Sequence, residues 1–148
     1  MRTERQIIIC FRKISNRIRR TAEAGLAEKY PDLSEMNACI LLFLRKKSFQ
    51  KKQVFQKDLE KEFSISKATV SQIIARMEGK HLIQKEESEE DSRKKRISLT
   101  EEAEKMLPFL KEADQIYETR ILEGFSEQEK EKLLAYLFRV QENLSRIE

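Results

Sequence analysis

Apolar residues recur at helical spacing along nearly the whole of this 148-residue chain, and the pattern changes at one place, residues 82–100. Only three Gly and two Pro interrupt the chain, there is no Trp, and charged residues make up 38% of it. A sequence poor in helix breakers and rich in Glu, Lys, Leu and Ile is typical of a helical protein. We therefore expect a mainly α fold with a single small β-hairpin.

Two long helices are predicted near the two ends of the sequence, over residues 5–28 and 127–147. Each has an apolar stripe that repeats in steps of three and four residues. The stripes consist of Ile7, Phe11, Ile14 and Ile18 in the first helix, and of Leu133, Leu137, Val140 and Leu144 in the last. Such stripes can be buried by pairing with a second copy of the chain, so we expect a homodimer.

Four further helices are predicted between these two, over residues 35–47, 56–63, 67–79 and 101–122. Ser34, Ser66 and Thr100 stand immediately before three of them and are the expected N-caps. The segment KKSFQKKQVFQ, residues 46–56, is expected to be a basic connector. Pro108 lies inside the helix predicted over 101–122 and should kink or divide it.

The segment from residue 82 to residue 100 has the pattern of a β-hairpin with a charged tip. Leu82 and Ile83 begin one strand, and Ile97 and Leu99 alternate on the other. An acidic run, EESEED (86–91), is followed by a basic run, RKKR (93–96). The two runs are either a solvated loop or a surface that meets a charged partner.

Charge is unevenly spread along the chain, whose net charge is +4. Residues 1–44 carry +3, residues 45–96 carry +6, and residues 97–148 carry −5. A strongly basic middle third in a nearly balanced chain indicates a polyanionic partner.

Two short helices joined by a tight turn at residues 64–66, and followed by the hairpin, indicate a winged helix-turn-helix. The polar face of the second of these helices has side chains of the kind that read base edges in the major groove. Gln56 and Lys57, at the start of the preceding helix, are placed for contact with the DNA backbone, and Lys94 and Lys95 should attract phosphate. The polar residues of the second helix are Lys67, Thr69, Ser71, Gln72 and Arg76.

Residues 56–106, QKDLEKEFSISKATVSQIIARMEGKHLIQKEESEEDSRKKRISLTEEAEKM, resemble the DNA-binding core of the MarR family of bacterial transcription regulators. The most specific part is Asp-x-Arg followed by Leu-Thr, here Asp91, Arg93, Leu99 and Thr100. The order of the helices on both sides also matches. One departure is His81, which stands where the family usually has Gly.

The resemblance implies an obligate dimer on a palindromic double-stranded DNA site. The helix over 67–79 would enter the major groove, with Ser66, Lys67, Thr69, Ser71 and Arg76 as its expected contacts. Arg93 would enter the minor groove, oriented by Asp91. On this view residues 35–100 form the DNA-binding lobe, with the wing at about 82–100. Residues 1–34 and 101–148 form the dimerisation region.

The family resemblance also implies a repressor that is released by a small-molecule effector. Phe43, Phe109 and Tyr117 could line an effector pocket, although core packing is the expected role of these rings. An alternative is a redox-sensing regulator, because the peroxide-sensing branch of the family has a reactive Cys near its N-terminus, where Cys10 stands here. A thiol on an apolar stripe is more often a small core residue, and Cys39 is predicted to be core. A third alternative is a winged-helix module that binds protein instead of DNA.

The remaining sequence features exclude other classes of protein. No catalytic motif or phosphate-binding Gly loop is present, so no enzyme activity and no cofactor are expected. One His and two Cys without a CxxC motif predict no metal site and two free thiols in a reducing compartment. No run of about 18 apolar residues predicts a membrane span, and the start of the chain does not have the pattern of a signal peptide. We expect a cytoplasmic protein.

Overall fold

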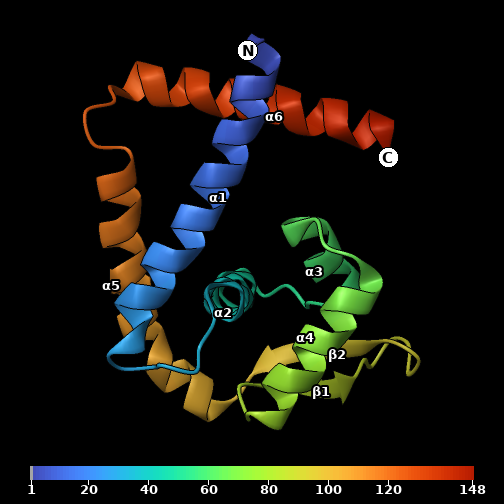
Figure 1. Cartoon of the computed structure of the whole chain (residues 1–148). Coiled ribbons are helices and arrows are strands. Elements are labelled where there is room, and N and C mark those ends of the chain that lie inside the picture. Colours follow the sequence, from blue (N-terminus) through green and yellow to red (C-terminus); the bar gives the residue numbers. More distant parts are fainter. Residues whose placement is uncertain (1) are drawn as a thin grey trace. The chain divides into compact units, whose positions relative to one another are not determined.

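The computed structural model describes residues 2–148, which form six helices and one two-stranded antiparallel hairpin (Figure 1). In chain order the elements are α1 (Thr3–Ala27), α2 (Glu35–Phe49), α3 (Gln56–Phe63), α4 (Lys67–Gly79), β1 (Ile83–Glu87), β2 (Lys95–Leu99), α5 (Glu101–Ile121) and α6 (Glu127–Ile147). The mainly α fold with a β-hairpin wing is confirmed. The chain forms two compact units, the first extending to Asp114 and the second comprising Gln115–Glu148.

The predicted N-caps are all in place. At each of four helix starts, a hydroxyl oxygen accepts a hydrogen bond from the backbone N–H three residues ahead, which satisfies one of the free donors there. The four pairs are Ser34 with Asn37, Ser66 with Thr69, Thr100 with Ala103 and Ser126 with Glu129. The Glu129 carboxylate accepts in return from the Ser126 N–H at 2.8 Å, which completes a capping box.

The core of the first unit is built around α2, whose Ile40 and Leu41 are 1% and 0% exposed. Leu59 of α3, Val70 of α4 and Leu110 of α5 belong to the same cluster and are as deeply buried. α2 is therefore the central, buried helix of this unit. α6 differs, because the structure shows no buried residue along it.

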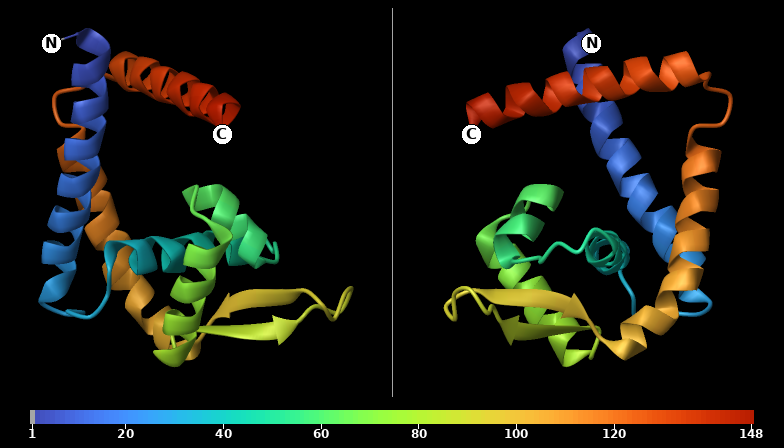
Figure 2. Two further views of the ribbon diagram at one scale, coloured as in Figure 1. Left: turned by 45° about the vertical axis from the view of Figure 1, so that its right-hand side comes forward. Right: turned by 180° about the vertical axis from the view of Figure 1, so that it is seen from behind.

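The hairpin is attached to the core at its base. β1 and β2 pair with Ile83 opposite Leu99 and Lys85 opposite Ile97. Ile83 and Ile97 are buried, and the Ile97 N–H donates to the Val54 carbonyl oxygen at 2.7 Å. The far end of the hairpin extends beyond α4 (Figure 2).

The structure corrects the predicted end of α2 and the predicted division of the helix at Pro108. α2 continues through Phe49, so only residues 50–55 connect α2 to α3. Lys46 and Lys47 lie in its last turn, where cations interact favourably with the helix dipole. α5 runs through Pro108 without division. Proline removes one helical hydrogen bond, but Leu107 and Leu110 on either side are buried, and this burial offsets the loss.

The two cysteines are free thiols, as expected, but neither is buried in the core. Cys10 is exposed, and Cys39 is only partly buried. Cys39 Sγ donates to Glu35 Oε1 at 3.4 Å. Burial raises the pKa of the Cys39 thiol to about 12, and the neighbouring Glu35 carboxylate adds to the shift.

Two of the three aromatic rings considered for an effector pocket, Phe43 and Phe109, pack against other rings of the first unit. Phe43 lies edge-on to Phe63, with centroids 5.8 Å apart, and Phe109 lies edge-on to Tyr30 at 5.5 Å. Within residues 2–148, no helix has the length and apolar character needed to cross a membrane. The same residues contain no cluster of three or more His, Cys, Asp or Glu side chains that could hold a metal ion.

Candidate nucleic-acid interface

The turn between α3 and α4 is tight and uses a left-handed residue. Ser64 has φ 49° and ψ 49°, a conformation that is uncommon for residues other than glycine. The Ile65 N–H then donates to the Glu60 carbonyl oxygen at 3.2 Å, and Ser66 begins the next helix as its N-cap. The turn therefore delivers α4 directly after α3.

α4 has one buried and one exposed face. Val70, Ile74 and Met77 are no more than 1% exposed and hold the helix to the core. All five polar side chains predicted to read DNA lie on the exposed face: Lys67, Thr69, Ser71, Gln72 and Arg76. Ala68 and Ala75 lie exposed among them. Sequence reasoning missed these two alanines, although their seven-residue spacing places them on that face.

Several of these polar groups are held by hydrogen bonds within the protein. Gln56 Nε2 donates to Ser71 Oγ at 2.9 Å and to the Lys67 carbonyl oxygen at 3.3 Å. Ser66 Oγ donates to Thr69 Oγ1 at 2.8 Å. The structure thus brings together five of the predicted DNA contacts as an ordered surface across α3 and α4.

At the tip of the wing, Asp91 and Arg93 form the pair that the family resemblance implied. Asp91 Oδ1 accepts from the Arg93 backbone N–H at 3.0 Å and from Arg93 Nε at 3.3 Å. Both bonds lower the pKa of the Asp91 carboxyl, and the bond from the backbone N–H has the larger effect. The Arg93 side chain is nevertheless 90% exposed, so its guanidinium is oriented yet open to a partner.

A second ion pair crosses the hairpin and accounts for part of the acidic run. Arg96 Nε and Nη2 both donate to Glu86 Oε2, the first at 3.0 Å. The two residues are directly opposite each other in the strand register. Arg96, the last residue of the basic run, is therefore neutralised by Glu86.

A pocket of about 440 Å³ opens between the start of α3, α4 and the wing. It brings together four cations predicted to contact DNA and one that was not predicted, Lys85. Lys85 shares the inward face of β1 with the buried Ile83, since side chains alternate along a strand. This alternation is the signal that could have identified it. The predicted cations are Lys57, Arg93, Lys94 and Lys95.

The fold and this face define a winged helix-turn-helix protein. The sequence model of the MarR family matches residues 31–94 of this chain. The resemblance seen in the sequence is confirmed over these residues.

Three relatives illustrate the similarity. The uncharacterized HTH-type transcriptional regulator YybA of Bacillus subtilis (strain 168) is 29% identical over 93 residues, which cover 63% of this chain. The match spans 62% of YybA. MepR, in the crystal structure of the S. aureus MepR–DNA complex, is 25% identical in sequence to this chain. The two structures superpose with a TM-score of 0.82, and the match covers 91% of this chain and 94% of MepR. A MarR/EmrR family transcriptional regulator from Acinetobacter sp. ADP1 shares the fold at 20% identity, with a TM-score of 0.85 and 99% of both chains covered.

Proposed function

We propose that this protein is a sequence-specific regulator of transcription that binds double-stranded DNA. The observation that carries the proposal is the exposed, hydrogen-bonded polar face of α4 beside a wing with an oriented, open Arg93. MepR, whose structure is similar over 91% of this chain, was crystallised bound to DNA. The basic charge of residues 45–96 supplies the attraction to phosphate that such binding requires.

In this proposal the exposed face of α4 reads bases in the major groove. Gln72 and Arg76 have the amide and guanidinium groups that make bidentate contacts with adenine and guanine. Ala68 and Ala75 allow close approach, and alanine also suits contact with a thymine methyl group. Arg93 reaches into the minor groove with Asp91 as its support. Residues 35–100 are then the DNA-binding lobe.

We also propose a homodimer that binds a palindromic site. The stripe on α1 includes Ile7 and Ile14, which are 46% and 53% exposed, and on α6 Leu144 is 52% exposed. Soluble proteins rarely leave such apolar surface uncovered, and pairing of two chains through residues 1–34 and 101–148 would bury it. Two recognition helices would then meet successive major grooves about 34 Å apart.

Repression, with release by a small molecule, is the mode of regulation that fits this arrangement. A protein that covers its site on DNA blocks other proteins from it, and an effector that binds only the DNA-free form shifts the equilibrium toward that form. The redox alternative has one observation in its favour, the exposure of Cys10. It is tested by measuring DNA affinity for reduced and peroxide-treated protein, with Cys10→Ser as the control.

The test of the proposed function is selection from a random duplex library. We expect enrichment of a palindromic consensus with half-sites about 10 base pairs apart. Affinity for that consensus and for a scrambled duplex of equal length is then measured over a range of salt concentrations. Binding to both should weaken steeply with salt, and the consensus should bind more tightly. Absence of enrichment together with a flat salt response would show that the winged helix binds a protein partner instead.

A further inference from the structure

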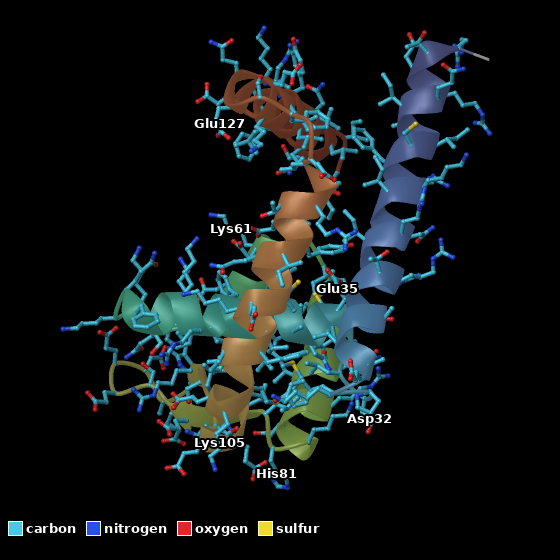
Figure 3. The ribbon with its side chains drawn as sticks, turned by 90° about the vertical axis from the view of Figure 1, so that its left-hand side faces the viewer. Asp32, Glu35, Lys61, His81, Lys105 and Glu127 are labelled. Carbon is cyan, nitrogen blue, oxygen red and sulfur yellow. The ribbon has the colours of Figure 1, made fainter. Side chains whose placement is uncertain are left out.

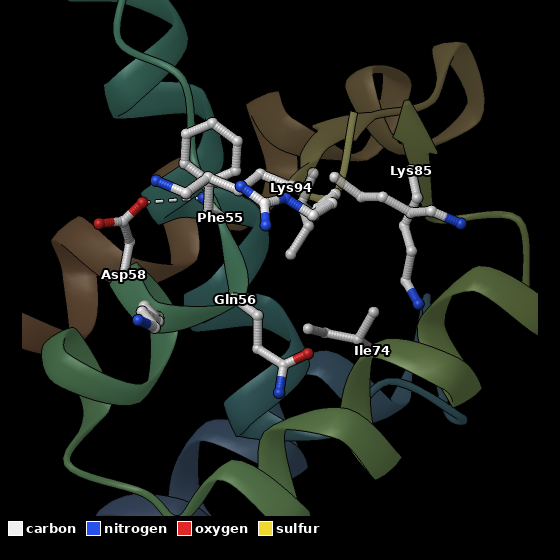
Figure 4. Close-up of a pocket in the computed structure, with 10 residues that line it drawn as sticks. Phe55, Gln56, Asp58, Ile74, Lys85 and Lys94 are labelled. Carbon is white, nitrogen blue, oxygen red and sulfur yellow. Dashed lines mark hydrogen bonds between the residues drawn. The ribbon is translucent and has the colours of Figure 1, made fainter. Parts of the chain in front are cut away.

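The pocket between α3 and the wing has a composition that DNA reading alone does not require. Figure 4 shows Gln56 and Ile74 on one side of it and Phe55 and Lys94 on the other, with Lys85 at the wing end. Its apolar surface comes from Phe55, Ile74 and Ile97, and its remaining wall is largely cationic. The site is therefore a concave surface with an apolar base and a positive rim.

The charge balance of the pocket favours an anion. Five cations line it, and Asp58 is the one carboxylate among its lining residues. Asp58 is already engaged, since its Oδ2 accepts the Phe55 backbone N–H at 2.8 Å. Figure 4 shows this carboxylate turned toward Phe55, at the opposite end of the pocket from Lys85. Gln56 and Lys57 are also the first two residues of α3, where backbone N–H groups lack helical acceptors.

Lys85 is the residue that most needs an explanation. It lies in β1 directly opposite the buried Ile97 and on the same face as the buried Ile83. An apolar residue would be expected at this second position of the face if the face served only to cover the core. A lysine there carries its ammonium over the pocket, and its aliphatic stem can lie against the apolar base.

The volume of the pocket indicates what kind of anion fits. About 440 Å³ lies within the range of small-molecule sites, roughly 300–1,000 Å³. It is larger than an inorganic phosphate needs. A phosphate together with its attached sugar would use both the cationic rim and the apolar base.

We infer that this pocket binds a phosphate ester, with Lys85 of the wing and Lys57 of α3 as its charged ligands. The inference rests on the proposed function, because it takes the ester to be one backbone phosphate of bound DNA with its deoxyribose. The same chemistry is offered by a free deoxynucleotide, so the experiment has one arm for each source. In both cases Lys85 becomes a binding residue that links the wing to α3 through the ligand.

The first arm compares Lys85→Gln with Lys105→Gln, which removes the same charge from an exposed site on α5 outside the pocket. Lys85→Gln should weaken binding to specific and random duplexes equally, by about tenfold. It should also reduce the slope of log affinity against log salt by about 0.9, the value for one lost phosphate contact. Lys105→Gln should match wild type, and Lys85→Arg should restore affinity. Circular dichroism checks that all three variants fold.

The same arm then locates the phosphate. Duplexes with a single neutral methylphosphonate linkage are scanned against wild type and Lys85→Gln. One linkage per half-site should weaken wild-type binding and have no further effect on Lys85→Gln, because both changes remove the same contact. Such coupling identifies the DNA backbone as the source.

The second arm titrates DNA-free protein with deoxyadenosine monophosphate and with inorganic phosphate at constant ionic strength, followed by NMR. Saturable shifts of the wing signals, absent in Lys85→Gln, assign the pocket to a free phosphate ester. The inference is overturned if Lys85→Gln and Lys105→Gln behave alike toward DNA and neither phosphate compound shifts the wing signals. If wild type binds no DNA, the proposed function fails, and the titration alone then decides whether the pocket binds phosphate.

Discussion

Gln56 Nε2 in α3 and Ser71 Oγ in α4 are joined by a hydrogen bond of 2.9 Å. Both residues were predicted from the sequence to contact DNA independently. The structure shows instead that they form a pair, and Gln56 also holds the Lys67 carbonyl oxygen. The recognition helix is thus fixed relative to α3 by the residues at its surface as well as by its buried face.

Gln56→Ala should therefore lower the free energy of unfolding by about 0.5–1.5 kcal/mol, the usual net contribution of a hydrogen bond. Urea denaturation measures this, with Gln53→Ala, an exposed glutamine of the preceding connection, as the control. Ser71→Ala should cost a similar amount. The double variant should lose less free energy of unfolding than the sum of the losses in the two single variants. Strictly additive losses would contradict the pairing.

Arg93→Ala should weaken DNA binding by about 1–3 kcal/mol while leaving the unfolding temperature unchanged. The reason is that the side chain is 90% exposed and contributes little packing. Asp91→Asn should weaken DNA binding less than Arg93→Ala does. It removes the negative charge that orients Arg93 but keeps the guanidinium. Electrophoretic mobility shift at fixed salt gives both values. Wild-type affinity in Arg93→Ala would remove the wing from the interface.

Glu86→Gln should increase affinity for random duplex DNA, because it releases the Arg96 guanidinium from its cross-strand partner. The salt dependence should steepen by about 0.9 in slope if Arg96 then contacts one phosphate. Glu89→Gln makes the same charge change within the acidic run, and it does not release Arg96. Equal effects of the two variants would show that the run acts through its total charge, and no effect of either would leave it a role in solubility alone.

Ile14→Asp in α1 and Leu144→Asp in α6 should each shift the protein from dimer to monomer. Both side chains are about half exposed in the single chain. Burying such a residue contributes roughly 1.5–3 kcal/mol, so the dimer dissociation constant should rise about ten- to a hundredfold. Sedimentation velocity over a concentration series measures it. Ser15→Asp adds the same charge to the exposed side of α1 and should leave the dimer intact.

His81→Gly should raise the free energy of unfolding by up to about 1 kcal/mol. His81 has φ 59° between α4 and β1 (Figure 3), and a side chain in this left-handed region costs roughly 1–2 kcal/mol. The greater freedom of glycine in the unfolded chain offsets part of the gain. His81→Val should destabilise, because β-branched residues tolerate this region least. A glycine variant less stable than wild type would indicate that the His81 side chain makes a stabilising contact.

The sequence by itself determined the helices, their caps and the winged helix-turn-helix order. These are local properties: α3 and α4 have the predicted ends. Apolar spacing and hydroxyl caps act over three to seven residues, so they can be read without knowing the fold. The Asp91–Arg93 pair is equally local, since a single residue separates its members.

Only the tertiary structure decided which surface residues meet. The Gln56–Ser71 bond joins residues 15 apart, and the Glu86–Arg96 pair depends on strand register. Burial likewise depends on what packs around a residue, which is why Cys39 is only partly buried and why α5 passes Pro108 intact. The Lys85 pocket needs three elements to be placed together. Long-range contacts of this kind follow from the packing of the whole lobe, and no short stretch of sequence encodes them.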